Sequence, residues 1–195
     1  TDTLSLKTVA KKEGDKYIVN GQKIWTSRAE HSDLMLLLAR TTPKEEAASR
    51  TEGLSVFLVD MKEALAAGSL TINPIDTMMN HATTAVFFDN MEVPAANLIG
   101  EEGKGFYSVM KNFQTERIAL AAMAVGHCQQ ALLHTLDYVR QRQAFGGPLW
   151  NQQVIRQRIS MLDAKTRAAR QFMYHCAWRV TQGHDIVQDV SMLKA

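Results

Sequence analysis

The stretch "NFQTERIALAAMAVG", residues 112–126, lies within the segment that decides the fold. From residue 105 to about residue 142, apolar residues recur every three or four positions, which predicts one helix of roughly ten turns. On a helical wheel with about 100° per residue, Phe113, Leu120 and Ala124 fall within about 20° of one direction. We therefore expect this apolar stripe to face the core of a helical domain.

Two charged residues, Glu116 and Arg117, flank this stripe at about 60° and about 40° on the wheel. They are either an ion pair at the edge of a core contact, with apolar stems buried and charges in water, or a carboxylate kept in a pocket as a base beside its arginine. Spacing alone favours the ion pair, because charged side chains are mostly exposed or structural.

The helix is interrupted by "FGGPLW", residues 145–150, which contains two glycines and a proline. A second long helix is predicted from about Leu149 to Gln182, with Gly183 as the residue that ends it, and a third begins near Asp185. Two long helices joined by a short break pack antiparallel. Their remaining apolar surface needs further helices, from this chain or another.

The first half of the chain has the pattern of short β-strands. "LKTVAKKE" and "KYIVNGQKIW" flank the turn dipeptide "GD" at residues 14–15, which predicts a hairpin. "DLMLLLAR", residues 33–40, is a continuous apolar run of strand length, expected to be buried on both faces. Further strands are predicted at residues 54–60, 69–75 and 83–93, with a polar loop at 41–53 and a helical turn at 62–68.

The predicted fold class is therefore α+β. An antiparallel β-barrel or sandwich, residues 1–102, precedes the long antiparallel helices of an incomplete four-helix bundle, residues 103–195. The domain boundary is expected near residues 100–105, where glycines and acidic residues gather.

The composition excludes several classes of protein. The hydrophobic fraction of 46% is ordinary for a globular domain, and a net charge of +2 gives no strong attraction to nucleic acid. Cys128 and Cys176 form neither a disulfide framework nor a zinc spacing, so we expect a reducing, intracellular compartment and no metal. No apolar run reaches the roughly 18 residues of a membrane span. The chain lacks an initiator Met, and we expect it to be part of a longer protein.

Four segments, in this order, resemble the acyl-CoA dehydrogenase family. They are "GQKIWTS" (21–27), "VFFDNMEVPAANLIGEEGKGF" (86–106), "TERIALAAMAVG" (115–126) and "RQRQAFGGPLWNQQ" (140–153). The resemblance implies a fold of an N-terminal helical bundle, a middle β-barrel and a C-terminal four-helix bundle. This chain is similar to the middle domain and about half of the last bundle.

The resemblance also implies an activity, the FAD-dependent α,β-dehydrogenation of an acyl-CoA thioester in fatty acid β-oxidation. In this reaction a carboxylate removes the α-proton, the β-hydrogen leaves as hydride to flavin N5, and an electron-transfer flavoprotein takes the electrons. A homotetramer or homodimer in the bacterial cytoplasm or mitochondrial matrix is expected, with no nucleic-acid partner. The alternatives are an acyl-CoA oxidase or flavin monooxygenase on the same scaffold, or a non-catalytic interaction module.

The flavin ring is expected to contact Trp25, Thr26 and Ser27. Taken alone, these residues also suit a strand end with a half-buried indole and two solvated hydroxyls. The resemblance implies that this segment lies against the isoalloxazine, with the Ser27 hydroxyl near N5.

Arg142, Phe145 and Gln153 are implied to reach the pyrophosphate and adenosine part of a flavin held mainly by a neighbouring subunit. The guanidinium of arginine suits this role because it binds phosphate oxygens in pairs. The residues alone allow a structural explanation, since Arg142 suits a helix C-terminus and Phe145 would plug the helix connection.

Glu116 is the candidate base. Most of the family places the base on a loop among its last helices, and a subgroup that includes the isovaleryl-CoA and long-chain enzymes places it just before an arginine on this helix, so both positions stay open. Arg117 is implied to orient the substrate or the base. At the position of Gln114, members of the family frequently carry an Asp that contacts CoA. Thr1 occupies the position of the Ser in the family's Gly-Ser-Asp segment, so Gln114 and Thr1 are both candidate substrate contacts.

His81 lies in a segment, residues 79–82, where relatives often carry an Arg beside the substrate path. The sequence gives His81 no catalytic role.

Overall fold

The computed structural model describes residues 3–79 and 82–195. The chain divides into two compact units, Thr1–Met110 and Lys111–Ala195, which are described here one at a time. The predicted boundary at residue 102 falls just before the first long helix, and the contacts divide the chain slightly later, inside that helix.

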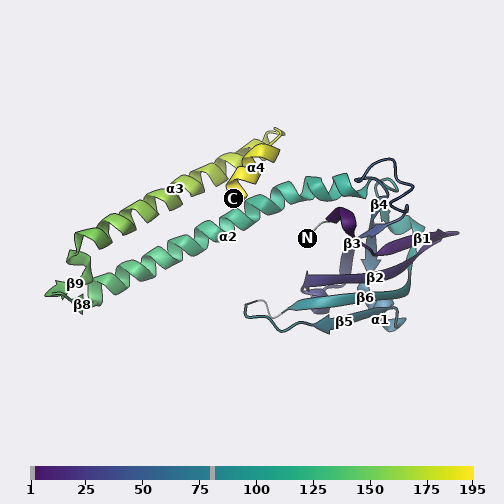
Figure 1. Ribbon diagram of the computed structural model, residues 1–195, viewed down its shortest axis with the longest axis horizontal. Coiled ribbons are helices and arrows are strands. Elements are labelled where there is room, and N and C mark those ends of the chain that lie inside the picture. Colours follow the sequence, from purple (N-terminus) through teal and green to yellow (C-terminus); the bar gives the residue numbers. More distant parts are fainter. Residues whose placement is uncertain (1–2, 80–81) are drawn as a thin grey trace. The chain divides into compact units, whose positions relative to one another are not determined.

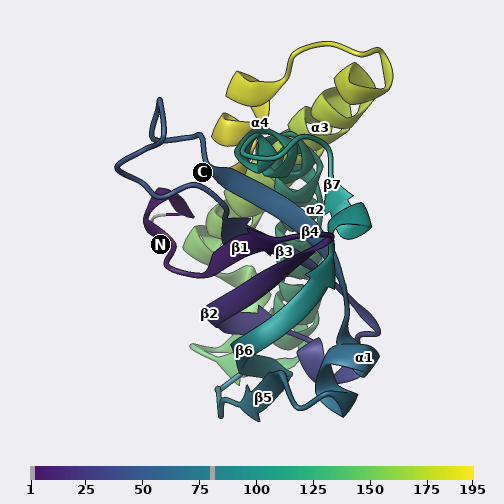
Figure 2. The ribbon, with the colours of Figure 1, turned by 90° about the vertical axis from the view of Figure 1, so that its right-hand side faces the viewer.

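The first unit is a seven-stranded sheet in the order β5-β6-β2-β1-β3-β4-β7 (Figures 1 and 2). Its strand pairs are antiparallel except β1 and β3, which run parallel and meet at Val9 and Arg40. The α1 helix (Met61–Ala66) follows β4, and the side chain of Asp60 caps its first turn. The strands are β1 (Val9–Glu13), β2 (Lys16–Ser27), β3 (Leu34–Arg40), β4 (Leu54–Asp60), β5 (Leu70–Pro74), β6 (Thr83–Pro94) and β7 (Leu98–Ile99).

This architecture confirms the predicted α+β class and corrects its detail. The ladder ends at β5 and β7, which do not pair with each other within the described part of the chain, so no closed barrel forms. A barrel needs its two edge strands to pair, and β7 contributes only two residues. The predicted hairpin is confirmed, because β1 and β2 pair in register around a turn in which Gly14 has a φ of 64°.

The core of this sheet gathers around the fully buried rings of Tyr17 and Phe57, whose centroids lie 4.8 Å apart. The Tyr17 hydroxyl donates to Glu102 Oε2 at 2.7 Å. On β3, Leu37 is buried but Leu36 is 65% exposed, so the prediction that this strand is buried on both faces is wrong. Successive side chains point to opposite faces of a strand, and only one face of β3 is covered within the unit.

The second unit is a pair of antiparallel helices that lie side by side in Figure 1. A two-stranded turn joins them, and the second helix begins later than predicted because Leu149–Asn151 forms a separate 3-10 turn. The elements are α2 (Gly105–Gln141), β8 (Gln143–Ala144), β9 (Gly147–Pro148), α3 (Gln153–Thr181) and α4 (Val187–Lys194). In the described ranges, no helix has the length and apolarity to cross a membrane.

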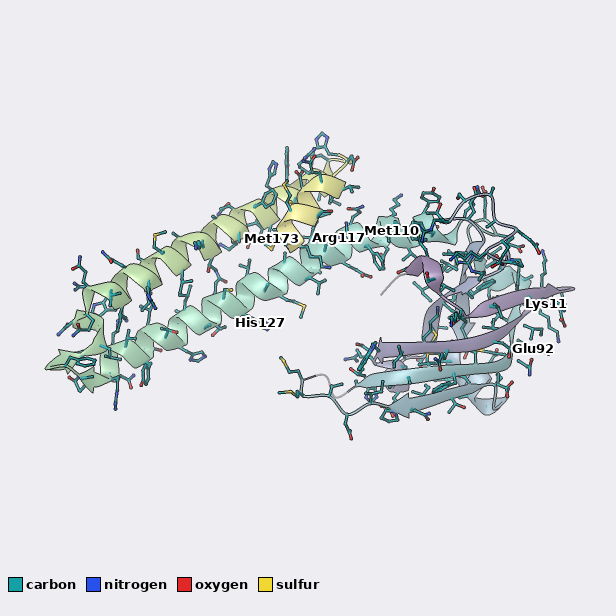
Figure 3. The ribbon with its side chains drawn as sticks, in the orientation of Figure 1. Lys11, Glu92, Met110, Arg117, His127 and Met173 are labelled. Carbon is teal, nitrogen blue, oxygen red and sulfur yellow. The ribbon has the colours of Figure 1, made fainter. Side chains whose placement is uncertain are left out.

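The face of α2 that packs against its neighbours differs from the predicted one. Ala121 and Val125 are buried, whereas Leu120 is 50% exposed and Ala124 and Cys128 are exposed. The covered face is thus turned by about 100° from the predicted stripe. Figure 3 shows the same division, with Met173 between the helices and His127 on the side of α2 that faces away from α3.

The α4 helix is held against the end of α3 by a small core and an ion pair. Cys176, Ile186 and Val190 are buried together, and Arg179 forms a partly buried ion pair with Asp189. Gly183 has a φ of 72° and follows the end of α3, which confirms its predicted role.

Candidate active site

Trp25 occupies a strained β-bulge near the end of β2. The β2–β6 ladder pairs Ile24 with Ala85 and Thr26 with Thr84, so Trp25 is an extra residue without a partner. Its φ is 65° and its side chain is 62% exposed. A left-handed conformation is a genuine outlier for a bulky residue and typically costs about 1–3 kcal/mol. The regular ladder on both sides holds this strain and presents the indole at the surface.

The two residues that follow Trp25 end the strand beside a second left-handed residue. Thr26 is half-buried, and its carbonyl accepts a hydrogen bond of 2.9 Å from Thr84 Oγ1. Ser27 is exposed and opposite Thr83 in the ladder. Arg28 has a φ of 63° and its N–H donates to the carbonyl of Ala82. The predicted trio Trp25, Thr26 and Ser27 therefore lies together on an irregular but well-bonded strand end.

Lys23, on β2 close to Trp25, is a perturbed group that the sequence analysis missed. Burial lowers the pKa of its ammonium to about 8. Within the ranges that the structure describes, no carboxylate lies within ion-pair distance of Lys23. A lysine inside a strand predicted to lie within the sheet is the signal that could have revealed it. Such perturbed groups are common near functional sites.

A second group of predicted residues lies at the connection between α2 and α3. Arg142 follows the last residue of α2, and its carbonyl accepts a hydrogen bond of 2.9 Å from the N–H of Leu149. Phe145, at the tip of the turn, has a φ of 54° and is 88% exposed, so it does not plug the helix connection. Gln153 is the exposed first residue of α3. The turn thus brings an arginine, an exposed aromatic ring and a glutamine to one end of the helix pair.

Glu116 and Arg117 do not form the predicted ion pair. Glu116 is exposed and accepts a hydrogen bond of 2.9 Å from Asn112 Nδ2, one turn earlier on α2. Arg117, labelled in Figure 3, donates from Nη1 to Ser191 Oγ of α4 at 3.3 Å. Adjacent residues on a helix point in different directions, which explains their separate partners.

The carboxylate of Glu116 belongs to the uncovered apolar face of α2. On the helical wheel it lies about 20° from Met123 and about 40° from Leu120. These two side chains are 60% and 50% exposed. Any layer that covers this apolar face would also remove the Glu116 carboxylate from water, which is the setting a general base requires.

Gln114 lies on the opposite, covered face of α2. Its Oε1 atom is buried and has no hydrogen-bond partner among the described residues, which is rare for a buried carbonyl. The other predicted substrate contact, Thr1, lies outside the described residues, as does His81. In the part of the chain that the structure covers, no group of three or more His, Cys, Asp or Glu side chains could hold a metal ion.

Family models match both parts of the chain. Residues 1–91 match the model described as "Acyl-CoA dehydrogenase, middle domain", and residues 103–195 match "Acyl-CoA dehydrogenase, C-terminal domain". An acyl-CoA dehydrogenase of Bacillus subtilis is 34% identical over 100% of this chain and 50% of its own length. The mitochondrial isovaleryl-CoA dehydrogenase of Pongo abelii is 32% identical over 97% of this chain and 44% of its own length.

A solved structure agrees with these matches. The acyl-CoA dehydrogenase of Geobacillus kaustophilus superimposes with a TM-score of 0.91 at 33% identity, covering 99% of this chain and 50% of that protein. The chain spans about half the length of the curated relatives it matches. Sequence, domain order and fold agree, and the chain belongs to the acyl-CoA dehydrogenase family.

Proposed function

We propose that the protein containing this chain is an FAD-dependent acyl-CoA dehydrogenase that introduces an α,β double bond into an acyl-CoA thioester. The observation that carries the proposal is Trp25, an exposed flat ring held at a strained bulge beside two hydroxyl residues. Backbone strain of this kind clusters at ligand sites, because the surrounding structure must stabilise it. FAD, when bound, supplies the acceptor for the hydride.

The residues of the first unit fit the ring system of a flavin. The Trp25 indole offers a flat apolar surface that excludes water from one face of an aromatic ligand. Ser27 brings a hydroxyl and a backbone amide at the exposed strand end, both suited to the polar atoms of such a ring. The carbonyl of Thr26 accepts a hydrogen bond from Thr84, and this bond fixes the backbone between Trp25 and Ser27.

The turn of the second unit fits the phosphate-bearing half of the same cofactor. Arg142 supplies a planar cation for phosphate oxygens, Phe145 an exposed ring for stacking, and Gln153 an amide. The side chain of Phe145 is almost wholly exposed in this chain, so it is available to pack against a partner surface. A neighbouring copy of the chain that carries the cofactor would supply such a surface, and we therefore include a homotetramer or homodimer in the proposal.

The proton transfer is assigned to Glu116. Its carboxylate accepts the α-proton of the substrate once the uncovered apolar face of α2 is closed and dry. Arg117 is fixed by Ser191 and acts as a positioning residue, which holds this part of α2 in place. The second candidate for the base is a carboxylate in a part of the protein outside this chain, as in most of the family. The match to an isovaleryl-CoA dehydrogenase supports Glu116.

The substrate contacts and partners complete the proposal. The unpartnered Oε1 of Gln114 can accept a hydrogen bond from a bound group, and Thr1 would contact the CoA moiety. An electron-transfer flavoprotein would reoxidise the enzyme, in the bacterial cytoplasm or mitochondrial matrix and within fatty acid β-oxidation.

Flavin spectroscopy on the full-length protein tests the proposal. The purified protein should be yellow, and anaerobic addition of an acyl-CoA should bleach the flavin absorbance. An acyl-CoA with no α-hydrogen is the matched control and should not bleach it. Rapid reoxidation of the bleached protein by oxygen would instead identify an oxidase or monooxygenase. A colourless protein that takes up no added FAD would contradict the proposal and favour a non-catalytic module.

A further inference from the structure

A groove of about 620 Å³ runs between the two long helices of the second unit, close to the connection that joins them. It is lined by residues of α2 from Gln129 to Arg140, by Trp150 of the connection, and by residues of α3 from Arg156 to Arg167. The two helices are antiparallel (Figure 1), so the end of α2 lies beside the beginning of α3. The groove therefore follows about three turns of each helix.

The floor of the groove is apolar and only partly covered. Ile159 of α3 is buried, Leu132 and Leu136 of α2 are half-buried, and Leu133 is 55% exposed. Leu132 and Leu136 are one helical turn apart and share a face of α2. Exposed leucines inside a groove offer a surface on which the apolar side chains of a partner can be buried.

Arginines lie at both ends of this apolar floor. Arg140 and Arg156 lie at the end nearer the connection, where the guanidinium of Arg140 lies 5.6 Å from the ring centroid of Trp150. At the other end, Arg167 forms an ion pair with Asp163 at 2.9 Å. Among the described residues that line the groove, Asp163 is the one carboxylate beside these three arginines, so the groove carries a net positive charge.

The spacing of the arginines on α3 restricts the shape of a matching partner. Arg156 and Arg167 are eleven residues apart, which separates them by about 16 Å along the helix axis and by only about 20° around it. A second α-helix that lies along the groove has the same periodicity. Carboxylates at its positions i and i+11 would meet both arginines, and apolar side chains at i+4 and i+7 would face the leucines of the floor.

The described elements of this chain do not supply such a helix. A second copy of the same groove would bring arginine against arginine, and like charges across an interface are unfavourable. None of the helices within residues 3–79 and 82–195 carries two carboxylates eleven residues apart. Charge complementarity therefore favours an acidic helix from outside this chain.

We propose that the groove between α2 and α3 docks an acidic amphipathic helix of a partner protein. The carboxylates of that helix pair with Arg156 and Arg167, and its apolar side chains cover Leu133 and the neighbouring leucines. This docking is independent of the proposed flavin chemistry, because none of the groove residues belongs to the candidate active site.

A synthetic peptide tests the groove on the full-length protein with any bound cofactor retained. The fluorescently labelled peptide has about 18 residues, with Glu at i and i+11, Leu at i+4 and i+7, and Ala and Gln elsewhere. Fluorescence anisotropy should show saturable binding that weakens as the salt concentration rises. The control peptide has its second Glu at i+9, on the opposite side of the helix, and should bind about tenfold more weakly.

Variants of the protein identify the groove as the place of binding. Arg156→Gln/Arg167→Gln changes two exposed side chains and should bind the peptide about tenfold more weakly. Arg158→Gln/Lys165→Gln removes the same charge from exposed positions on the opposite side of α3 and should bind like the wild type. Leu133→Gln should also weaken binding, because it removes an apolar contact of the floor.

Absence of saturable binding to the full-length protein would show that another part of the protein or a second copy already covers the groove, and it would overturn the proposal. Equal affinity for the two peptides, or unchanged affinity in Arg156→Gln/Arg167→Gln, would also overturn it. Flavin bleaching by acyl-CoA should be the same in this double variant as in the wild type. A failure of docking is therefore distinct from a failure of the proposed activity.

Discussion

Glu116 and Arg117 are neighbours in sequence but bond to different elements of the second unit. Glu116 accepts a hydrogen bond from Asn112 within α2, whereas Arg117 reaches Ser191 of α4. Glu116 is exposed and contributes little to packing, while Arg117 is half-buried and links two helices. Substitution of Glu116 should therefore change chemistry, and substitution of Arg117 should also change stability.

Glu116→Gln should slow the bleaching of the flavin by acyl-CoA by about 10²–10⁴-fold, because the amide cannot take the α-proton. The melting temperature should stay close to that of the wild type, since exposed substitutions usually change stability by no more than about 0.5 kcal/mol. Anaerobic stopped-flow absorbance and a thermal melt measure the two effects. Asn112→Ala removes only the hydrogen bond to Glu116 and is the control. Full activity in Glu116→Gln would place the base outside this chain.

Trp25→Gly and Trp25→Ala should both weaken flavin binding, because each removes the indole. Their stabilities should differ, since glycine adopts a φ of 65° without strain and alanine does not. We expect Trp25→Gly to be more stable than Trp25→Ala by about 1 kcal/mol. Flavin absorbance after gel filtration and urea unfolding measure these quantities. Trp178→Ala removes a tryptophan that is 55% exposed on α3 and serves as the control. An unchanged flavin spectrum in both Trp25 variants would make the indole purely structural.

Lys23→Met should stabilise the protein near neutral pH and flatten the pH dependence of its free energy of unfolding. The pKa of Lys23 is lowered by burial from 10.5 to about 8 in the folded state. At pH values between these two pKa values, the unfolded state binds more protons than the folded state, so the free energy of unfolding of the wild type rises with pH. At lower pH the folded protein carries the charged lysine and the full cost of burying that charge. The stability advantage of Lys23→Met should therefore shrink between about pH 8 and about pH 10.5, which are the folded and unfolded pKa values of Lys23.

This pH range also separates Lys23 from Tyr17, because burial and the hydrogen bond to Glu102 raise the pKa of Tyr17 to about 12. Urea unfolding at several pH values gives the required free energies. Lys165→Met, on the exposed surface of α3, should show no such trend. An advantage of Lys23→Met that is constant with pH would show that Lys23 stays charged in the folded protein.

Gly21→Ala should destabilise the first unit by about 2–4 kcal/mol. A Cβ at this position would lie 2.8 Å from the Cα of Thr8, and the φ of Gly21 is 135°. Gly14→Ala is the matched control, because Gly14 also has a positive φ but nothing lies within 4 Å of its added Cβ. It should cost only about 1 kcal/mol of backbone strain. Equal melting temperatures for the two variants would contradict the steric explanation.

The elements of the fold were predictable from the sequence, but the covered faces were not. Periodicity located α2, α3 and the hairpin of β1 and β2. The predicted buried face of α2 is wrong because that helix carries two apolar stripes. The periodicity of the sequence does not show which of the two stripes packs against another helix. The prediction that β3 is buried on both faces is wrong for the same reason. An apolar sequence does not reveal whether a second layer covers the other face of the strand.

The sequence nominates the residues of the candidate site, whereas their geometry is given only by the structure. Trp25, Arg142 and Phe145 were identified through segments that resemble a family, whereas the left-handed backbone of Trp25 and Phe145 follows from strand pairing and turn geometry. The burial of Arg40 also depends on tertiary structure, because Leu4 and the β1 strand, which lie against it, are distant in sequence. Chemical identity is local, but burial and strain come from long-range contacts.

The short turn between α2 and α3 fixes how far α3 is rotated about its own axis relative to α2. Arg142 and Leu149 are joined by a backbone hydrogen bond, and Ala144 pairs with Gly147 between them. One residue inserted at the end of α2 would rotate everything after it by about 100° and advance it by about 1.5 Å. The Phe145 ring would then point to a different side of the pair. Length changes in this helix pair are therefore tolerable only in steps close to whole turns, such as three, four or seven residues.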